Sequence, residues 1–199
     1  MDLIWKDKEA IIIYRRIEEV KDHIVLFRPV YNEHGNVTEL FYLEDEKLKK
    51  ACDKRSLIYV RQSLARIYNL DLSAQTREVE NFLHRKNALP FYLPDGRVFV
   101  ALKMRKPVIV GDNTYGFVDY HFIKSVRKVN GQVKLKLTTG DEITLYSTAT
   151  VAYNSINLGR DVFEYTYGRT DHEKAKILDA LETLLNKLYN IEKLLDKIQ

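Results

Sequence analysis

The chain has 199 residues, of which 45% are hydrophobic and 30% charged, so it can bury a sizeable core and does not belong to the disordered class. Its one cysteine, Cys52, excludes an intramolecular disulfide and a zinc site built from cysteines. The net charge of +4 is unevenly distributed: Lys and Arg number 6 against 11 Asp and Glu in residues 1–46, 19 against 7 in residues 47–136, and 7 against 10 in residues 137–199.

The basic middle segment, residues 47–136, attracts a polyanion, and nucleic acid is the commonest polyanion in a cell. The same composition also fits a solvated basic surface that has no partner. No apolar run approaches the ~20 residues of a membrane span, and the first residues contain no apolar stretch of signal-peptide length. We therefore expect a cytoplasmic protein, associated with the nucleoid if it binds DNA, with no membrane partner.

The N-terminal third is predicted to form strands. Short runs of apolar and β-branched residues cover residues 10–15, 23–30 and 37–43, and a turn at His34-Gly35-Asn36 precedes the last of them. Runs of this length that are bounded by turn residues suit an antiparallel meander.

Two helices are predicted in the middle of the chain. In the first, apolar residues recur at steps of three and four, as on one face of a helix, and Ser56 is placed to cap it. These apolar residues are Leu57, Val60, Leu64 and Ile67. Its exposed face would carry Arg61 and Arg66. The second helix covers residues 73–86 and is expected to turn Val79, Phe82 and Leu83 inward.

From Ala88 onward the pattern is again that of strands. A hairpin is predicted over residues 91–102, with a turn at Pro94-Asp95-Gly96. Residues 117–129, 132–137 and 143–146 then predict a three-stranded ribbon, because Asn130-Gly131 is a strong hairpin signal and apolar residues alternate with lysines in the second strand. One face of this ribbon is expected to be basic and to carry Lys124, Arg127, Lys128, Lys134 and Lys136.

The C-terminal tail carries a heptad pattern over three repeats. The residues of its apolar seam are Ile177, Leu181, Leu184, Leu188, Ile191, Leu195 and Ile198. Leu at one seam position with mostly Ile at the other favours assembly of more than two strands. The pattern also fits a helix that packs on its own domain. We therefore divide the chain into an α+β domain, residues 1–170, and a C-terminal amphipathic or oligomerisation helix, residues 171–199.

Motifs of enzyme chemistry are missing from the sequence. The five histidines show no paired ligand spacing, and the turn between Gly111 and Gly116 lacks the Gly-Lys-Ser/Thr ending of a phosphate loop. No Gly-x-Ser-x-Gly elbow occurs. We predict no catalytic residues, no metal site and no cofactor, and hence no enzyme, although a nuclease that assembles its acids from distant positions stays open.

A resemblance to a known family begins at the first predicted helix. Lys54-Arg55-Ser56 and Ser63-Leu64-Ala65-Arg66 are similar to an Arg-Ser and Ser-Tyr-Ala-Gly-Arg block of the ComK family, the competence transcription factors of Gram-positive bacteria. Pro90 followed by Val98-Phe99-Val100-Ala101 resembles the proline, short linker and Phe-rich strand of that family.

The resemblance continues in the second half of the chain. Tyr115-Gly116-Phe117-Val118, followed by Tyr120-His121-Phe122, resembles a Gly-Trp-Ile segment and a strand that contains histidine. Residues 139–145, and then Asn157 and Arg160, resemble an Asn-Gly turn, a strand and an Asn-Gln/Arg segment. The resemblance is remote, because it covers about half of the chain and phenylalanine stands where the family has tryptophan.

The resemblance implies an activator that binds A/T-rich DNA as a dimer or higher multimer, largely through the minor groove, and that an adaptor delivers to a Clp protease. On this basis Arg66 falls on an arginine of the family. Minor-groove reading depends on groove width, and arginine inserted into a narrow groove is its usual device.

Residue pattern and resemblance together predict a DNA-binding transcriptional regulator of the α+β class. It would have a β-rich antiparallel core of hairpins and a meander, two mid-chain helices and a heptad-patterned C-terminal helix. The expected DNA contacts are Arg61, Arg66, Lys103, Arg105, Lys106, Lys124, Arg127, Lys128, Lys134 and Lys136. The alternatives are an adaptor or scaffold that associates through its C-terminal helix and, third, an enzyme that processes nucleic acid.

Overall fold

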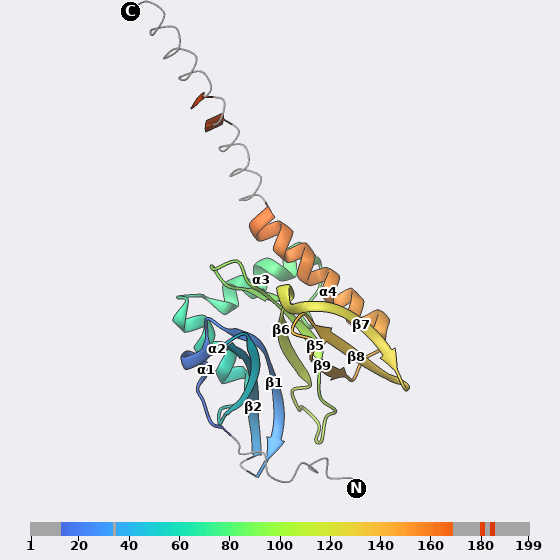
Figure 1. Ribbon diagram of the computed structural model, residues 1–199. Helices are drawn as coiled ribbons and strands as arrows, with labels where there is room; N and C mark the ends of the chain where they lie inside the picture. Colours follow the sequence, from blue (N-terminus) through green and yellow to red (C-terminus); the bar gives the residue numbers. More distant parts are fainter. Residues whose placement is uncertain (1–12, 34, 169–179, 182–183, 186–199) are drawn as a thin grey trace, which may run out of the picture. The chain divides into compact units, whose positions relative to one another are not determined.

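The computed structural model describes residues 13–33, 35–168, 180–181 and 184–185. The chain divides into two compact units, residues 1–162 and 163–199. The first unit holds two antiparallel sheets together with mid-chain helices, so the predicted α+β class is confirmed (Figure 1). Most of the tail helix predicted over residues 171–199 lies outside the described residues.

A six-stranded antiparallel sheet forms the centre of the first unit, with strand order β3-β2-β1-β6-β5-β4. Its strands are β1 (Ile24–Asn32), β2 (Gly35–Glu44), β3 (Lys47–Asp53), β4 (Phe91–Tyr92), β5 (Val98–Lys103) and β6 (Tyr115–Asp119). The predicted N-terminal meander is present as β1 and β2, to which β3 adds a strand that the prediction missed. The strand predicted over residues 10–15 is, where described, a single bridge between Tyr14 and Cys52.

Successive residues of the central strands enter two different hydrophobic cores. In β5, Phe99 and Ala101 belong to one buried cluster, and Val100 and Leu102 belong to the other. This follows from the alternation of side chains in a strand when both faces of a sheet are covered. The first face is covered by α1 (Ile17–Val20), α2 (Leu57–Ile67) and α3 (Leu72–Leu83) (Figure 1).

Both predicted mid-chain helices are present, although the second ends at Leu83 instead of Lys86, because His84 adopts a left-handed backbone conformation there. In α2, Leu57, Val60 and Leu64 are buried against the sheet as expected. The carboxylate of Asp71 caps α3 by accepting the amides of its first turn. Phe82 was expected to face inward, but 38% of it is exposed, because the buried side of α3 is formed by Gln75 and Val79.

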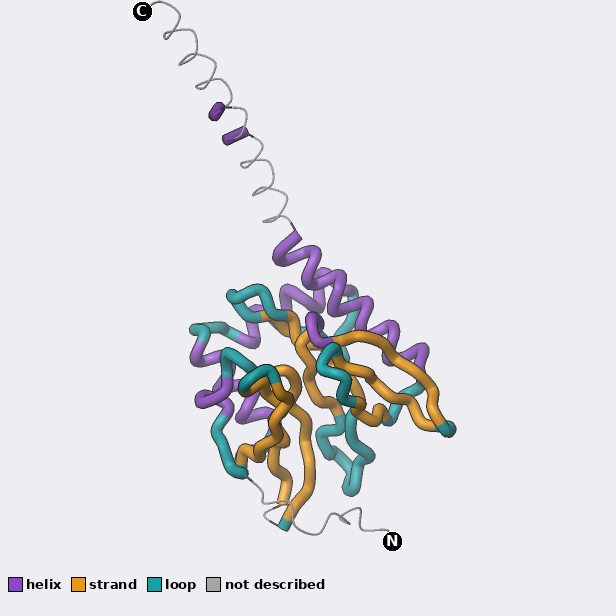
Figure 2. Tube along the Cα trace, viewed as in Figure 1, coloured by secondary structure: helices purple, strands orange, loops and turns teal. Residues whose placement is uncertain are grey.

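A three-stranded antiparallel sheet covers the second face. It consists of β7 (Ile123–Val129), β8 (Gln132–Leu137) and β9 (Glu142–Leu145) and confirms the predicted ribbon (Figure 2). The single strand predicted over residues 117–129 is wrong, since a 3₁₀ turn, η1 (Tyr120–Phe122), separates β6 from β7 and moves the chain between the sheets. The buried carboxylate of Asp119 stabilises this turn by accepting the amide of His121 at 3.0 Å.

The helix α4 (Ala149–Phe163) was not predicted, and a π-helical turn, η2 (Glu164–Gly168), follows it. Its buried residues recur at helical spacing but are mostly small: Ala152, Ser155, Gly159 and Val162. A Cβ on Gly159 would lie 2.4 Å from Cγ2 of Val100, so glycine allows α4 to approach β5 closely. In the described part of the chain, every helix is too short or too polar to cross a membrane.

Candidate nucleic-acid interface and an arginine-lined cavity

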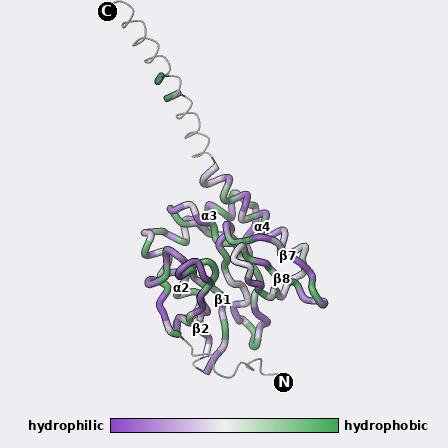
Figure 3. The backbone as a smooth tube through the Cα atoms, in the orientation of Figure 1, coloured by the Kyte–Doolittle hydropathy of each residue, from purple (hydrophilic) through white to green (hydrophobic). Residues whose placement is uncertain are grey.

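The hairpin of β7 and β8 is the most basic element of the fold. Residues 123–140 contain five Lys and Arg side chains and no Asp or Glu. Charged and apolar residues alternate along β8, so that Val133, Leu135 and Leu137 are buried while Lys134 and Lys136 face away from the core. Figure 3 shows hydrophilic and hydrophobic residues interspersed along the hairpin.

The register of the hairpin divides its cations between two faces. Arg127 pairs with Lys134, and Lys136 pairs with Ser125, so Arg127, Lys134 and Lys136 share the outer face. The expectation that all five cations form one face is wrong for Lys128, because this residue pairs with the buried Val133 on the inner side.

The other two points about the hairpin are the position of Lys124 and the hydrogen bonding of Lys134. Lys124 is exposed in the irregular register between Ile123 and Ser125. On the outer face, the ammonium of Lys134 donates to the hydroxyl of Thr144 on β9 at 2.7 Å, which leaves two of its three donors for another partner.

On its inner side, Lys128 faces a groove of about 690 Å³ together with Lys106. The groove is also lined by Thr144, Tyr146 and Ser147, and none of its lining residues is acidic. The ammonium of Lys106 lies 5.8 Å from the ring centroid of Tyr146. Two lysines with neighbouring hydroxyls and no carboxylate can bind an anionic group such as a phosphate.

Arg105, which was predicted to contact DNA, is held inside the protein. Only 11% of its side chain is exposed, and its guanidinium donates to Asn36 at 2.9 Å and lies 3.5 Å from Asp112. The same group lies 4.5 Å above the ring of Tyr31. These contacts fix the loop between β5 and β6, and they place Arg105 outside the candidate interface.

The same loop is fixed by the carboxylate of Asp112. It accepts the hydroxyl of Tyr31 at 2.6 Å and the amides of Val108 and Ile109. The Tyr31 hydrogen bond, followed by the Ile109 amide, lowers the pKa of Asp112 to about 2. Of the other predicted contacts, Arg66 is exposed at the end of α2, and Lys103 is partly buried at the end of β5.

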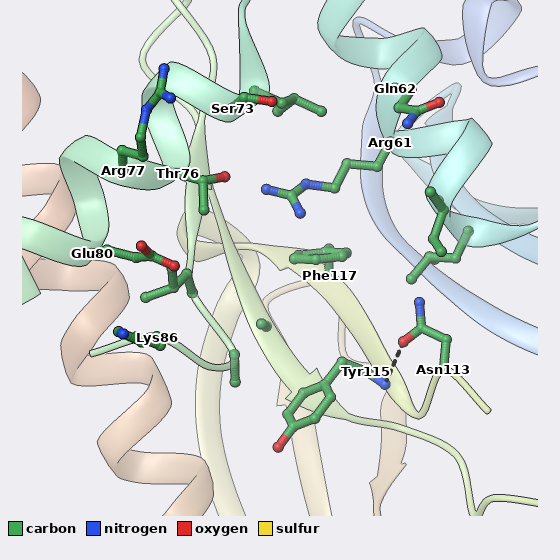
Figure 4. A pocket seen from close by; sticks show the side chains of 16 residues that line it. Arg61, Gln62, Ser73, Thr76, Arg77, Glu80, Lys86, Asn113, Tyr115 and Phe117 are labelled. Carbon is green, nitrogen blue, oxygen red and sulfur yellow. Dashed lines mark hydrogen bonds between the residues drawn. The ribbon is translucent and has the colours of Figure 1, made fainter. Parts of the chain in front are cut away.

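Arg61 is the predicted DNA contact whose position differs most from expectation. Rather than lying on an exposed helix face, it projects into a cavity of about 640 Å³ between α2 and α3 (Figure 4). Its guanidinium carbon lies 4.8 Å from the ring centroid of Phe91 and 5.2 Å from that of Phe117. The nitrogen Nε is buried without a hydrogen-bond partner, and burial lowers the pKa of the group.

A signal for this position does exist in the sequence. Arg61 lies four residues after Leu57 and three before Leu64, which places it on the apolar stripe of α2 rather than opposite it. Because this stripe packs on the sheet, the long side chain of Arg61 extends along the edge of the core and places its guanidinium over the aromatic rings.

The rest of the cavity combines apolar walls with polar groups. Its three cations outnumber one acid: Arg61, Arg77 and Lys86 against Glu80. Figure 4 shows the side chain of Arg77 directed away from Arg61, while that of Thr76 lies on the opposite wall facing the guanidinium.

The structure describes only part of the predicted apolar seam in the C-terminal tail. Of the seven seam residues of the tail, the structure describes Leu181 and Leu184, which are helical and 51% and 56% exposed. The other five, Ile177, Leu188, Ile191, Leu195 and Ile198, lie outside the described residues.

Within the described residues, no three His, Cys, Asp or Glu side chains are grouped to hold a metal ion. Burial, followed by the charge of Glu39, raises the pKa of the Cys52 thiol.

Comparison of the chain with models of protein families, with curated proteins and with solved structures finds no match.

Proposed function

We propose that the protein is a DNA-binding transcriptional regulator that contacts the DNA backbone with the β7–β8 hairpin and the groove beside it. The observation that carries the proposal is the hairpin's charge: it has five cations, no acid, and basic side chains on both faces. Arg127, Lys134 and Lys136 lie on the outer face, and Lys128 lies with Lys106 in the groove.

A two-stranded ribbon has the dimensions to enter the major groove, and strand-based readers of both grooves occur. Lysines on such a ribbon neutralise phosphates, which releases counterions and makes affinity fall steeply as salt rises. The preference for A/T-rich sites and the multimeric state belong to this proposal through the ComK resemblance, and they guide the choice of probe.

The test is the affinity for an A/T-rich duplex as a function of salt, for the full chain and for the variant K134E/K136E. We expect the reversal to weaken binding about tenfold or more and to reduce the salt slope by about 2, because roughly one phosphate contact is lost per lysine. Circular dichroism of the variant shows whether the fold is kept.

A matched control is available on the edge strand β3. Lys47 and Lys49 are exposed, lie two residues apart like Lys134 and Lys136, and are outside the proposed interface. K47E/K49E changes the net charge equally, so we expect it to leave most of the affinity and the slope intact. Equal losses in both variants would contradict a specific interface, and an unmodified chain that binds no duplex at physiological salt would favour the adaptor alternative.

A further inference from the structure

Arg61 is a cation that the fold partly removes from water without giving it a polar partner. No hydrogen bond or ion pair joins its guanidinium to any side chain in the described part of the chain, and its contacts are with the faces of Phe91 and Phe117. Burying a charge without a partner is unfavourable, and burial is the cause that lowers the pKa of this group. An anion placed against the guanidinium would remove this cost.

The space beside Arg61 is large enough for such an anion with a body of its own. Cavities that hold small molecules measure roughly 300–1,000 Å³ and combine apolar walls with a few polar groups. This cavity measures about 640 Å³ and is walled by Leu57 and Ile58 of α2, Leu72 of α3 and the ring of Phe117.

The polar groups around the cavity are suited to an anion. Ser73 and Thr76 of α3 offer hydroxyls across from Arg61, and Lys86 adds a second cation at the far side (Figure 4). The first amides of α3 are not available for this purpose, because the carboxylate of Asp71 already accepts those of Ser73 and Ala74. Charge recognition in the cavity therefore depends on side chains.

From these observations we propose that the cavity between α2 and α3 binds a small organic anion. Its carboxylate or phosphate pairs with Arg61, and its apolar body lies against Leu57, Leu72 and Phe117. The site is separate from the β7–β8 hairpin and is built from different elements. The proposal thus goes beyond DNA binding and stands or falls independently of it.

The probe for the test is 1-anilinonaphthalene-8-sulfonate, which joins a fixed negative charge to an aromatic body and fluoresces when it leaves water. Titration of the folded full-length chain measures its affinity, and competition follows with octanoate and with the uncharged octanol. We expect saturable binding at one site per chain, with octanoate displacing the probe at concentrations at least about tenfold lower than octanol, since octanol lacks the carboxylate that accepts charge-assisted hydrogen bonds from a guanidinium.

Two charge-matched variants separate the site from general attraction. R61Q removes the guanidinium that lies in the cavity (Figure 4), whereas R66Q removes an equal charge from an exposed residue of α2 that does not line the cavity. We expect R61Q to weaken octanoate binding about tenfold or more and to abolish the preference over octanol, and R66Q to have little effect. R61K, which keeps the charge, should recover part of the affinity. Thermal unfolding of each variant confirms that it is folded.

Three results would overturn the proposal. The first is equal weakening by R61Q and R66Q, and the second is equal displacement by octanoate and octanol, since either means that Arg61 does not recognise the anion. The third is displacement of the probe by the A/T-rich duplex, because Arg61 would then belong to the nucleic-acid interface. Failure of the duplex to bind at all leaves the first two measurements, and hence this proposal, unaffected.

Discussion

Two arginines that stand six residues apart, Arg55 just before α2 and Arg61 within it, have opposite surroundings. The guanidinium of Arg55 donates to both oxygens of Asp53 at 2.9 and 2.6 Å, to both oxygens of Glu18 at 2.8 and 2.6 Å, and to the hydroxyl of Ser63 at 2.8 Å. Arg61 has aromatic faces on one side and a cavity on the other. The charge of Arg55 is therefore used within the fold, and that of Arg61 is available to a ligand.

The difference comes from which elements meet at each arginine. Asp53 ends β3, Glu18 lies on α1 and Ser63 is on α2, so the Arg55 contacts join three elements at one point. Asp53 is 2% exposed and also accepts the amide of Ile17 at 3.0 Å. Near Arg61 the neighbouring helix α3 presents hydroxyls across a cavity, and the one acid of that cavity, Glu80, forms no ion pair with Arg61.

The largest expected effect follows from removing the partnered arginine. R55M leaves the carboxylate of Asp53 buried without its ion-pair partner, and breaking a buried pair typically costs about 3 kcal/mol or more of the free energy of unfolding. Urea unfolding followed by circular dichroism measures this loss. R66M serves as the control, because Arg66 is exposed on the same helix and should change stability by less than about 0.5 kcal/mol. Equal losses in the two variants would contradict a structural role for Arg55.

A smaller effect is expected on the pH dependence of stability. Hydrogen bonds from Arg55 lower the pKa of Glu18 to about 2 from its ordinary 4.5. Because the pKa is lowered in the folded state, this stabilisation is complete above pH 4.5 and is lost as the pH falls toward 2. Glu18 is 37% exposed, so solvent screening reduces the contribution to about 1 kcal/mol.

The measurement is the free energy of unfolding of the unmodified chain minus that of E18Q, taken at several pH values. Taking the difference isolates Glu18 from other carboxyls with lowered pKa, such as Asp112. We expect about 1 kcal/mol at pH 6 and a value that declines toward zero near pH 2. A difference that stays constant with pH would show that Glu18 stabilises the fold by contacts other than the ion pair.

Local patterns in the sequence were sufficient to predict α2, α3 and the β7–β8–β9 ribbon, because each shows its apolar period with large side chains and has clear turn residues. They were insufficient for α4, whose buried stripe of Ala152, Ser155 and Gly159 is made of small residues. They were also insufficient for β3, where lysines occupy the exposed positions of an edge strand.

For the candidate site, too, some residues were placed correctly from the sequence and others were not. The alternation in β8 correctly placed Lys134 and Lys136 on one outer face. Arg105 gave no such indication, because its partners Tyr31, Asn36 and Asp112 are brought to it only by the tertiary fold. Local sequence patterns predict on which face of its strand or helix a residue lies. They do not predict the hydrogen-bond and ion-pair partners that distant segments bring to it.

The smallest expected effect concerns the stability of a variant at Arg61, and it is the sharpest test of the contrast between the two arginines. R61M removes the cation–π contacts with Phe91 and Phe117, which are worth about 1 kcal/mol, but it also removes the cost of a partly buried charge that has no polar partner. The unbranched methionine stem can still cover the two rings. We expect the free energy of unfolding to change by less than about 1 kcal/mol, a third or less of the loss in R55M. A loss in R61M as large as that in R55M would mean that the fold itself depends on the Arg61 charge, and the two arginines would then not differ in role.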